Sequence, residues 1–128
     1  LGASETVLVF DHHITFMGGF EAFLEALPAL RGRCVEKKLF VEAGPDEARR
    51  LAKAGVDGIQ LDKMPVDDLA ALVPELRTID PHLTLIAAGG INLQNAAAYA
   101  ACGVDGLATT APFTAKPIDM SVRMKRAE

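Results

Sequence analysis

Short apolar runs alternate along the chain with longer segments in which apolar residues recur every three or four positions. The runs, rich in Val, Ile and Leu, predict strands at residues 7–10, 39–41, 58–61, 83–87 and 106–109. The longer segments between them predict amphipathic helices. Strands that alternate with helices are typical of repeated βα units in a parallel sheet. The pattern therefore predicts a fold of the α/β class.

Proline and glycine mark where the first three helices are expected to begin and end. The first helix carries an apolar face over residues 20–27 and is expected to end near Pro28. The second begins at residues 44–45 and stops at Gly55. The third begins near residue 66, and Pro74 is expected to kink or split it.

Two further elements are predicted near the end of the sequence. Asn92 is a good N-cap for a helix over residues 93–101. Apolar and polar side chains alternate over residues 118–124, which predicts a last, half-exposed strand. This strand and the open edges of the sheet lack partners, so we expect strand pairing between copies or oligomerisation.

One short motif occurs twice. Residues 54–59, AGVDGI, recur as CGVDGL at residues 102–107, 48 positions later. That offset fits two βα units of about 24 residues each. A turn that α/β proteins reuse and descent from a duplicated unit explain the repeat equally well.

Composition excludes several functions. A chain of 128 residues, half of them apolar, is expected to fold as one domain. A net charge of −4, no long basic run and 5% aromatic residues argue against a nucleic-acid surface. Cys34 and Cys102 lie far apart and indicate neither a disulfide framework nor a zinc site. No apolar run approaches the ~18 residues of a membrane span, and no basic signal-peptide flank is present, so a cytoplasmic protein is expected.

Polar residues follow the predicted strands, and the carboxyl ends of parallel strands meet at one edge of a sheet. Glu42 and Asp62 end consecutive strands. If these strands pair, the two carboxylates lie roughly 5 Å apart and could share a divalent cation, bind sugar hydroxyls or exchange protons. Capping of a helix and simple solvation are the alternatives. Lys63 is equally compatible with a surface charge and with a phosphate ligand.

A glycine pair offers a phosphate site at the same edge. Gly89 and Gly90 let backbone N–H groups approach an anion near the helix expected to begin at Asn92. Residues 109–110, two threonines, follow the next strand and strengthen this prediction, because phosphate sites recur at the last loops of barrels. His12 and His13 lie on a segment expected to be extended, so at most one of them faces the site.

Several motifs in order carry a resemblance to a known family. They are LVFDHHI at residues 8–14, VE at 41–42, IQLDK at 59–63, AGGINL at 88–93 and YAACGVD at 99–105. Together they resemble the C-terminal half of the quinolinate phosphoribosyltransferase family. Residues 60–63 and 110–117 are most similar to its ModD members, which are encoded with molybdate transporters.

The resemblance implies part of a truncated, TIM-like α/β barrel and a single domain over residues 1–128 that lacks the family's N-terminal domain. It implies transfer of a phosphoribosyl group from phosphoribosyl pyrophosphate to a small heterocyclic base. By this resemblance Glu42 and Asp62 are the catalytic carboxylates and candidate Mg²⁺ ligands. The implied phosphate- and substrate-binding residues are His13, Lys63, Ala88, Gly89, Gly90, Asn92, Thr110 and Ala111.

The sequence also departs from the family's pattern. The quinolinate enzymes carry a lysine where this chain has Phe10, an asparagine at Lys63 and a glycine at Thr110. Loss of a cation at position 10 argues against a dicarboxylate acceptor such as quinolinate. The family completes each site with a partner subunit, so we expect a homodimer or higher oligomer and an inactive isolated fragment.

Two other functions are compatible with these residues. A non-catalytic accessory protein that binds molybdate or a sugar phosphate would need only the anion pocket. A barrel isomerase or aldolase would use Lys63 to form a Schiff base. The phosphoribosyltransferase prediction rests on the combination of the carboxylate pair and the glycine pair.

Overall fold

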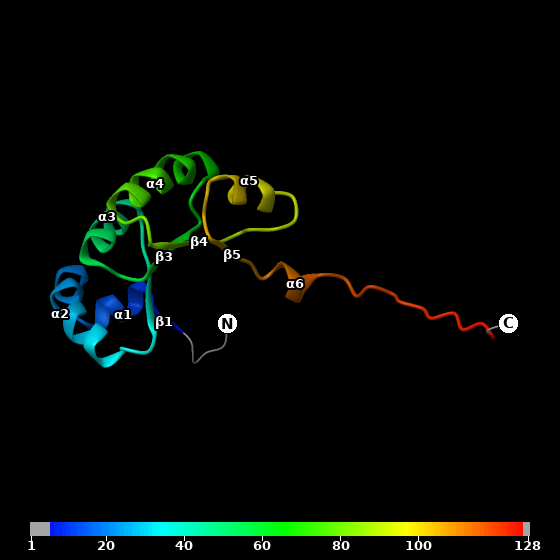
Figure 1. Cartoon of the computed structure of the whole chain (residues 1–128), viewed down its shortest axis with the longest axis horizontal. Coiled ribbons are helices and arrows are strands. Elements are labelled where there is room, and N and C mark those ends of the chain that lie inside the picture. Colours follow the sequence, from blue (N-terminus) through cyan, green and yellow to red (C-terminus); the bar gives the residue numbers. More distant parts are fainter. Residues whose placement is uncertain (1–5, 127–128) are drawn as a thin grey trace.

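A computed structural model describes residues 6–126, so the ends of the predicted 1–128 domain lie outside the described residues. Five parallel strands form one sheet in the order β1-β2-β3-β4-β5 (Figure 1). The strands are β1 Thr6–Val9, β2 Lys38–Glu42, β3 Gly58–Asp62, β4 Thr84–Ala88 and β5 Gly106–Ala108. All five predicted strands are confirmed, with ends that shift by at most one residue.

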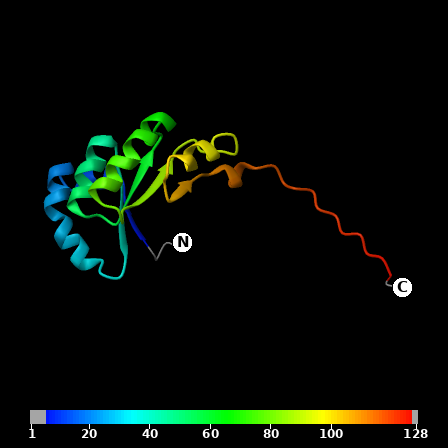
Figure 2. The same ribbon diagram turned by 45° about the horizontal axis from the view of Figure 1, so that its top comes forward.

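The strand order follows the chain, and this decides where the helices lie. A right-handed crossover to the next strand in the same direction always returns over the same face of the sheet. The helices between the strands accordingly line one face, as Figures 1 and 2 show. They are α1 Asp11–Phe16, α2 Phe20–Arg33, α3 Pro45–Ala54, α4 Val66–Ile79 and α5 Ala96–Ala101, and the short α6 Ala111–Thr114 follows β5 on the segment that leads away from the sheet. This arrangement is that of a barrel sector.

The hydrophobic core lies between the helices and the sheet. Strand residues that point toward the helices, such as Val41, Ile59 and Leu85, are fully buried. Phe23 of α2 and Leu69 of α4 pack against them from the other side. Alternate residues of the central strands and the apolar faces of the helices therefore meet in one buried layer.

The opposite face of the sheet carries a different set of side chains. Phe40 lies over Gly58 of the neighbouring strand, and a Cβ at position 58 would come within 2.6 Å of its ring. Lys38 and Ile86 line a groove of about 510 Å³ on this face. Gly58 therefore lets a large ring lie flat across two strands.

An aspartate fixes the amino end of β2. Asp57 accepts a hydrogen bond from the Leu39 N–H at 2.8 Å and donates its own N–H to the Leu39 carbonyl at 3.0 Å. Arg31 of α2 reaches the same carboxylate at 3.3 Å. Asp57, the residue directly before β3, thereby joins β2 to α2.

The same device occurs again at β4. Asp105 accepts the Leu85 N–H at 2.7 Å and donates to the Leu85 carbonyl at 2.8 Å, and Arg77 of α4 pairs with its carboxylate at 2.6 Å. Gly55 and Gly103, which precede the two aspartates, have φ of 79° and 85°. The repeated hexapeptide is thus a repeated structural unit that ends a helix and fixes the amino end of the neighbouring, preceding strand.

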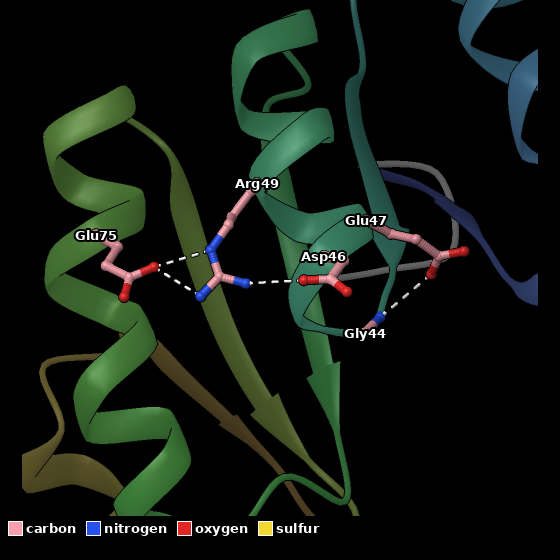
Figure 3. A network of polar contacts seen from close by, with 5 residues as sticks. All are labelled: Gly44, Asp46, Glu47, Arg49 and Glu75. Carbon is pink, nitrogen blue, oxygen red and sulfur yellow. Dashed lines mark hydrogen bonds and ion pairs between the residues drawn. The ribbon is translucent and has the colours of Figure 1, made fainter.

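Ion pairs also join helices on the outer surface. Arg49 of α3 pairs with Glu75 of α4 at 2.7 Å and with Asp46 at 3.2 Å (Figure 3). Glu47, one residue after Asp46, turns the other way and accepts the Gly44 N–H at 3.4 Å. Each exposed pair of this kind adds about 1 kcal/mol at most to the free energy of unfolding. These pairs therefore help to orient α3 but contribute little to the stability of the fold.

Two expected helix breaks are wrong. Helix α2 continues through Pro28 to Arg33, and α4 continues through Pro74 without splitting. In both helices the apolar face continues past the proline: Leu30 of α2 packs, partly buried, against the core, and Leu76 of α4 is fully buried. Burial of that face outweighs the lost backbone hydrogen bond.

Two other local predictions are corrected. His12 and His13 lie in helix α1 rather than on an extended segment, because a helical turn brings Ile14 into the core. The helix expected over residues 93–101 begins only at Ala96, since side-chain hydrogen bonds of Asn92 and Asn95 hold the preceding turn.

The predicted last strand is absent from the described part of the chain. Residues 118–124 run outward without regular structure in Figure 2, and Ile118, Met120, Val122 and Met124 are between 84% and 93% exposed. A strand needs a neighbour for its backbone groups, and none of the described residues supplies one. No helix within residues 6–126 is long and apolar enough to cross a membrane.

Asp105 is expected to link stability to pH. Partial burial works to raise its pKa, but hydrogen bonds from the Leu85 N–H and Arg77 outweigh it and hold the pKa below its ordinary value. The stabilisation is therefore complete above the unfolded-state pKa and is lost as the pH falls through the folded-state pKa. Asp105→Asn should lower the free energy of unfolding by about 1–2 kcal/mol at neutral pH, a low figure because the carboxylate is 44% exposed.

Urea unfolding of both proteins from about pH 7 down to about pH 2 measures this effect. The difference between them should shrink toward zero in acid. Asp119→Asn, an exposed residue of the extended segment, is the matched control and should match the unsubstituted chain throughout. A difference for Asp105→Asn that stays constant with pH would contradict the assignment.

Candidate functional site

Two pockets lie at the carboxyl edge of the sheet. An acidic pocket of about 220 Å³ follows β2 and β3. A glycine pocket of about 320 Å³ follows β4 and β5. The acidic pocket is lined by Asp11, Glu42, Ala43, Gly44, Glu47 and Asp62. The glycine pocket is lined by Ala88, Gly89, Gly90, Ile91, Ala108, Thr109 and Thr110.

Glu42 and Asp62 share the acidic pocket, but they do not face each other directly. In the parallel register Glu42 pairs with Gln60, and Asp62 lies two residues further along β3. The Gln60 amide donates to Glu42 Oε2 at 2.9 Å. The expected convergence of the two carboxylates is therefore seen, while the direct pairing is not.

Asp62 is paired with the residue that follows it. Lys63 Nζ lies 2.7 Å from Asp62 Oδ2, and the Lys63 N–H donates to the Ala88 carbonyl at 2.8 Å. The hydrogen bond to Asp62, its negative charge and the charge of Glu42 raise the pKa of Lys63, against a small opposing effect of desolvation. The ammonium group thus stays charged beside the acidic pocket.

The glycine pair forms a turn that only glycine adopts easily. Gly89 and Gly90 have φ of 85° and 70°, in the left-handed region. The side-chain amides of Asn92 and Asn95 donate to the Gly90 carbonyl at 3.2 and 3.1 Å. Because these two bonds hold the Gly90 carbonyl, the turn is fixed in shape. Asn92 therefore shapes the turn and does not line the pocket.

The two pockets meet where Gly89 approaches Asp62. A Cβ at position 89 would lie 2.5 Å from Lys63 Cγ, 2.6 Å from Lys63 N and 2.7 Å from Asp62 Oδ1. Two of these three atoms belong to backbone or to a paired carboxylate, so they have little room to move. Close packing at this point places a carboxylate next to a phosphate-type turn.

Two threonines after β5 complete the glycine pocket. The Thr109 hydroxyl hydrogen-bonds to the Ile91 carbonyl and accepts the Ala111 N–H at 3.1 Å. It thereby joins the loops after β4 and β5. Thr110 lines the pocket, whereas Ala111 is the first residue of α6 and lies outside its lining.

His13 is not brought to either pocket. Its ring lies on α1, exposed, and its Nδ1 accepts the Phe10 N–H at 2.9 Å. The rings of Phe10 and His12 stack at 5.6 Å beside it. The histidine therefore acts on the local chain, as a cap on the first turn of α1.

The carboxylates of the acidic pocket do not form a metal centre by themselves. Within residues 6–126, no three or more His, Cys, Asp or Glu side chains are arranged to hold a metal ion. Glu42 and Asp62 offer two carboxylates, each already hydrogen-bonded to a neighbour. Such a pair suits a Mg²⁺ that arrives with substrate phosphates better than a resident ion, because Mg²⁺ in proteins is often held by one or two carboxylates plus phosphate.

Sequence reasoning gave no site role to Asp11 and Glu47, which line the acidic pocket. Asp11 directly follows the first strand, and that position was the available signal. Glu47 stands in the first turn of α3, where it was expected only to favour the helix dipole. The side chain reaches back to Gly44 and so joins the wall of the pocket.

A singly wound parallel sheet with its polar pockets at the carboxyl edge defines the class: part of an α/β barrel with a ligand site in its βα loops. The model of the quinolinate phosphoribosyl transferase C-terminal domain matches residues 1–123. The chain therefore belongs to the quinolinate phosphoribosyl transferase family, which is a family of enzymes.

Individual relatives agree with this assignment. ModD of Escherichia coli O127:H6, provisionally described as a pyrophosphorylase, is 35% identical over 127 residues, covering 98% of this chain and 45% of that protein. A Synechocystis protein described as a probable carboxylating nicotinate-nucleotide pyrophosphorylase is 31% identical over 130 residues, covering 98% and 43%. The nicotinate-nucleotide pyrophosphorylase structure from Francisella tularensis superposes with a TM-score of 0.71 at 25% identity, covering 83% and 36%. The chain thus spans less than half the length of these relatives.

The approach of Gly89 to Asp62 predicts a steep cost for a side chain there. Gly89→Ala should lower the free energy of unfolding by roughly 3 kcal/mol, from the left-handed backbone and the overpacked Cβ together. Gly90→Ala is the matched control, because its Cβ would meet none of the described atoms within 4 Å, and it should cost only about 1–2 kcal/mol. Urea unfolding measures both, and equal losses would show that the close packing is absent.

Proposed function

We propose that this edge of the sheet binds phosphoribosyl pyrophosphate and takes part in transferring its phosphoribosyl group to a heterocyclic base. The observation that carries the proposal is the contact between Gly89 and Asp62, which joins an anion pocket to a carboxylate pocket. A ribose phosphate has the matching polarity, with an anionic phosphate at one end and hydroxyl groups at the other.

Each pocket has a distinct role in the proposed reaction. Backbone N–H groups near Gly89 and Gly90, with Thr110, receive the 5′-phosphate. Glu42 and Asp62 accept hydrogen bonds from the ribose hydroxyls. As the bond from C1 to the pyrophosphate oxygen breaks, C1 gains positive charge, which the carboxylates stabilise. A base nitrogen then bonds to C1 and pyrophosphate leaves, so no protein nucleophile is needed.

Magnesium enters this proposal with the substrate. Such an ion would supply charge neutralisation at the pyrophosphate leaving group. Glu42 and Asp62, which line the acidic pocket, are the residues of this chain that would hold it. Their role toward Mg²⁺ stays a prediction, as does the role of His13, whose ring lies away from both pockets.

The acceptor is proposed to be a neutral or weakly charged heterocycle. Phe10 directly follows β1, and its ring stacks with His12. The quinolinate enzymes carry a lysine at this position, so its replacement by an uncharged ring disfavours a dicarboxylate acceptor such as quinolinate. We also propose that the reaction serves molybdenum transport and takes place in the cytoplasm, and the similarity to ModD supports the first of these two points.

The reaction is proposed for a larger assembly than this chain alone. The described sheet ends in two open strand edges, β1 and β5. We propose that the isolated 128-residue chain binds ligand but does not turn over, and that a longer protein that contains it forms the complete site.

Binding and turnover should therefore separate. Calorimetry should show that the 128-residue chain binds phosphoribosyl pyrophosphate, while pyrophosphate release with a panel of bases should need the longer protein. Glu42→Gln and Asp62→Asn should each lower turnover by about a hundredfold or more. Glu25→Gln, an exposed residue of α2, is the control and should leave turnover unchanged.

Molybdate separates this proposal from an accessory function. Tight binding of molybdate without binding of phosphoribosyl pyrophosphate would overturn the transferase proposal and favour a non-catalytic anion-binding protein. Trapping with borohydride and a carbonyl substrate tests the third possibility, a Schiff base at Lys63, and no adduct is expected.

Self-association is a separate prediction. Ile118, Met120, Val122 and Met124 project from the body of the domain, exposed and on alternate positions. Extended apolar segments and open sheet edges favour pairing between copies. Light scattering should report a dimer or larger species for the 128-residue chain, and a monodisperse monomer would contradict this prediction.

A further inference from the structure

Lys63 has an unusual backbone for a residue with a long side chain. It is the one non-glycine residue within residues 6–126 with a positive φ, +52°. The left-handed region crowds Cβ against the backbone, so ordinary residues stay there only where surrounding contacts impose it. Such residues concentrate at functional sites.

Contacts at both ends of the residue impose this conformation. The Lys63 N–H donates to the Ala88 carbonyl at 2.8 Å, which ties it to the end of β4. The ammonium nitrogen lies 2.7 Å from Asp62 Oδ2. Between them, the stem lies so close to Gly89 that only glycine fits there. Lys63 is thus fixed where the acidic and glycine pockets meet.

The ammonium group balances charge in a pocket rich in carboxylates. Asp11, Glu42, Glu47 and Asp62 line the acidic pocket, and the described residues form no metal-binding group. Lys63 pairs with one of these carboxylates while its side chain remains 81% exposed. A cation that is both paired and accessible can stay beside Asp62 and still contact an anion that enters from solvent.

We propose that Lys63 is the resident counter-cation of this site: it takes the place of a divalent ion at Asp62 and contacts the phosphate of a bound sugar phosphate. The proposal rests on the proposed function, in which a ribose phosphate binds at this edge. It makes Lys63 a specificity residue, because the chain then binds a sugar monophosphate without metal, and a divalent ion must displace the lysine to reach Asp62.

Calorimetry with ribose 5-phosphate tests the first consequence. The 128-residue chain should bind it with similar affinity in EDTA and in Mg²⁺. Lys63→Gln should weaken binding in EDTA by about tenfold or more, since a charge-assisted hydrogen bond is lost. Lys63→Arg keeps the charge and should restore most of the affinity. Lys53→Gln, an exposed residue of α3, is the matched control and should bind as the unsubstituted chain does.

Titration with Mn²⁺, followed by electron paramagnetic resonance, tests the second consequence without any sugar phosphate. Removal of the competing ammonium should make Lys63→Gln bind Mn²⁺ about threefold tighter or more, and Lys63→Arg should not. Circular dichroism and urea unfolding check that each variant is folded. Because Lys63→Arg keeps the positive charge, a change seen only in Lys63→Gln is due to loss of the charge and not to a structural effect of the substitution.

The outcomes distinguish this inference from the proposed function. Binding of ribose 5-phosphate only with Mg²⁺, or equal binding by Lys63→Gln in EDTA, would show that Lys63 is a surface charge and overturn the inference alone. Absence of ribose 5-phosphate and phosphoribosyl pyrophosphate binding under both conditions would overturn the proposed function. Unchanged Mn²⁺ affinity in Lys63→Gln would overturn the counter-cation role in either case.

Discussion

The site depends on the parallel pairing of β3 with β4 over their whole length. Five residue pairs run in register from Gly58 with Thr84 to Asp62 with Ala88, so the two strands end side by side. The chain leaves β3 through Lys63 and β4 through Gly89, and these two residues then lie in contact. A slip of one residue would turn Asp62 toward the helices and bury its carboxylate in the apolar layer. Register therefore decides both the core and the chemistry.

The two ends of the sheet divide stability and function between them. At the amino ends, Asp57 and Asp105 fix the strands β2 and β4 through backbone hydrogen bonds and an arginine each. At the carboxyl ends the backbone adopts left-handed conformations at Lys63, Gly89 and Gly90, and the one at Lys63 costs free energy because only glycine adopts this region readily. The carboxyl edge can hold these conformations because the opposite edge and the core fix the strands independently. This division is general in barrels, where the βα loops carry function.

The sequence was sufficient for the sheet and insufficient for several local features, for physical reasons. Strands were predictable because a strand with one face in the core needs an apolar run, and each run here lies between clear turn residues. The course of α2 past Pro28 was not predictable from the sequence. Whether the helix continues depends on how much apolar surface the residues after the proline can bury. His13 was placed on an extended segment for a similar reason, since its helix forms around the burial of a single residue, Ile14. A strand at residues 118–124 has the correct alternation, but pattern alone supplies no neighbouring strand.

For the site as well, some features could be predicted from the sequence and others could not. The sequence identified Glu42, Asp62 and the glycine pair, because each directly follows a strand and strand ends share an edge. It could not show that Glu42 faces Gln60 while Asp62 faces Lys63, because register and a positive φ are not visible in residue order. Those two contacts matter most for the electrostatics: a neutral amide leaves Glu42 its charge, whereas an ammonium group balances that of Asp62. Two carboxylates that look alike in the sequence are therefore unlike in the fold, and the one next to the glycine turn is the one whose negative charge would otherwise repel a phosphate.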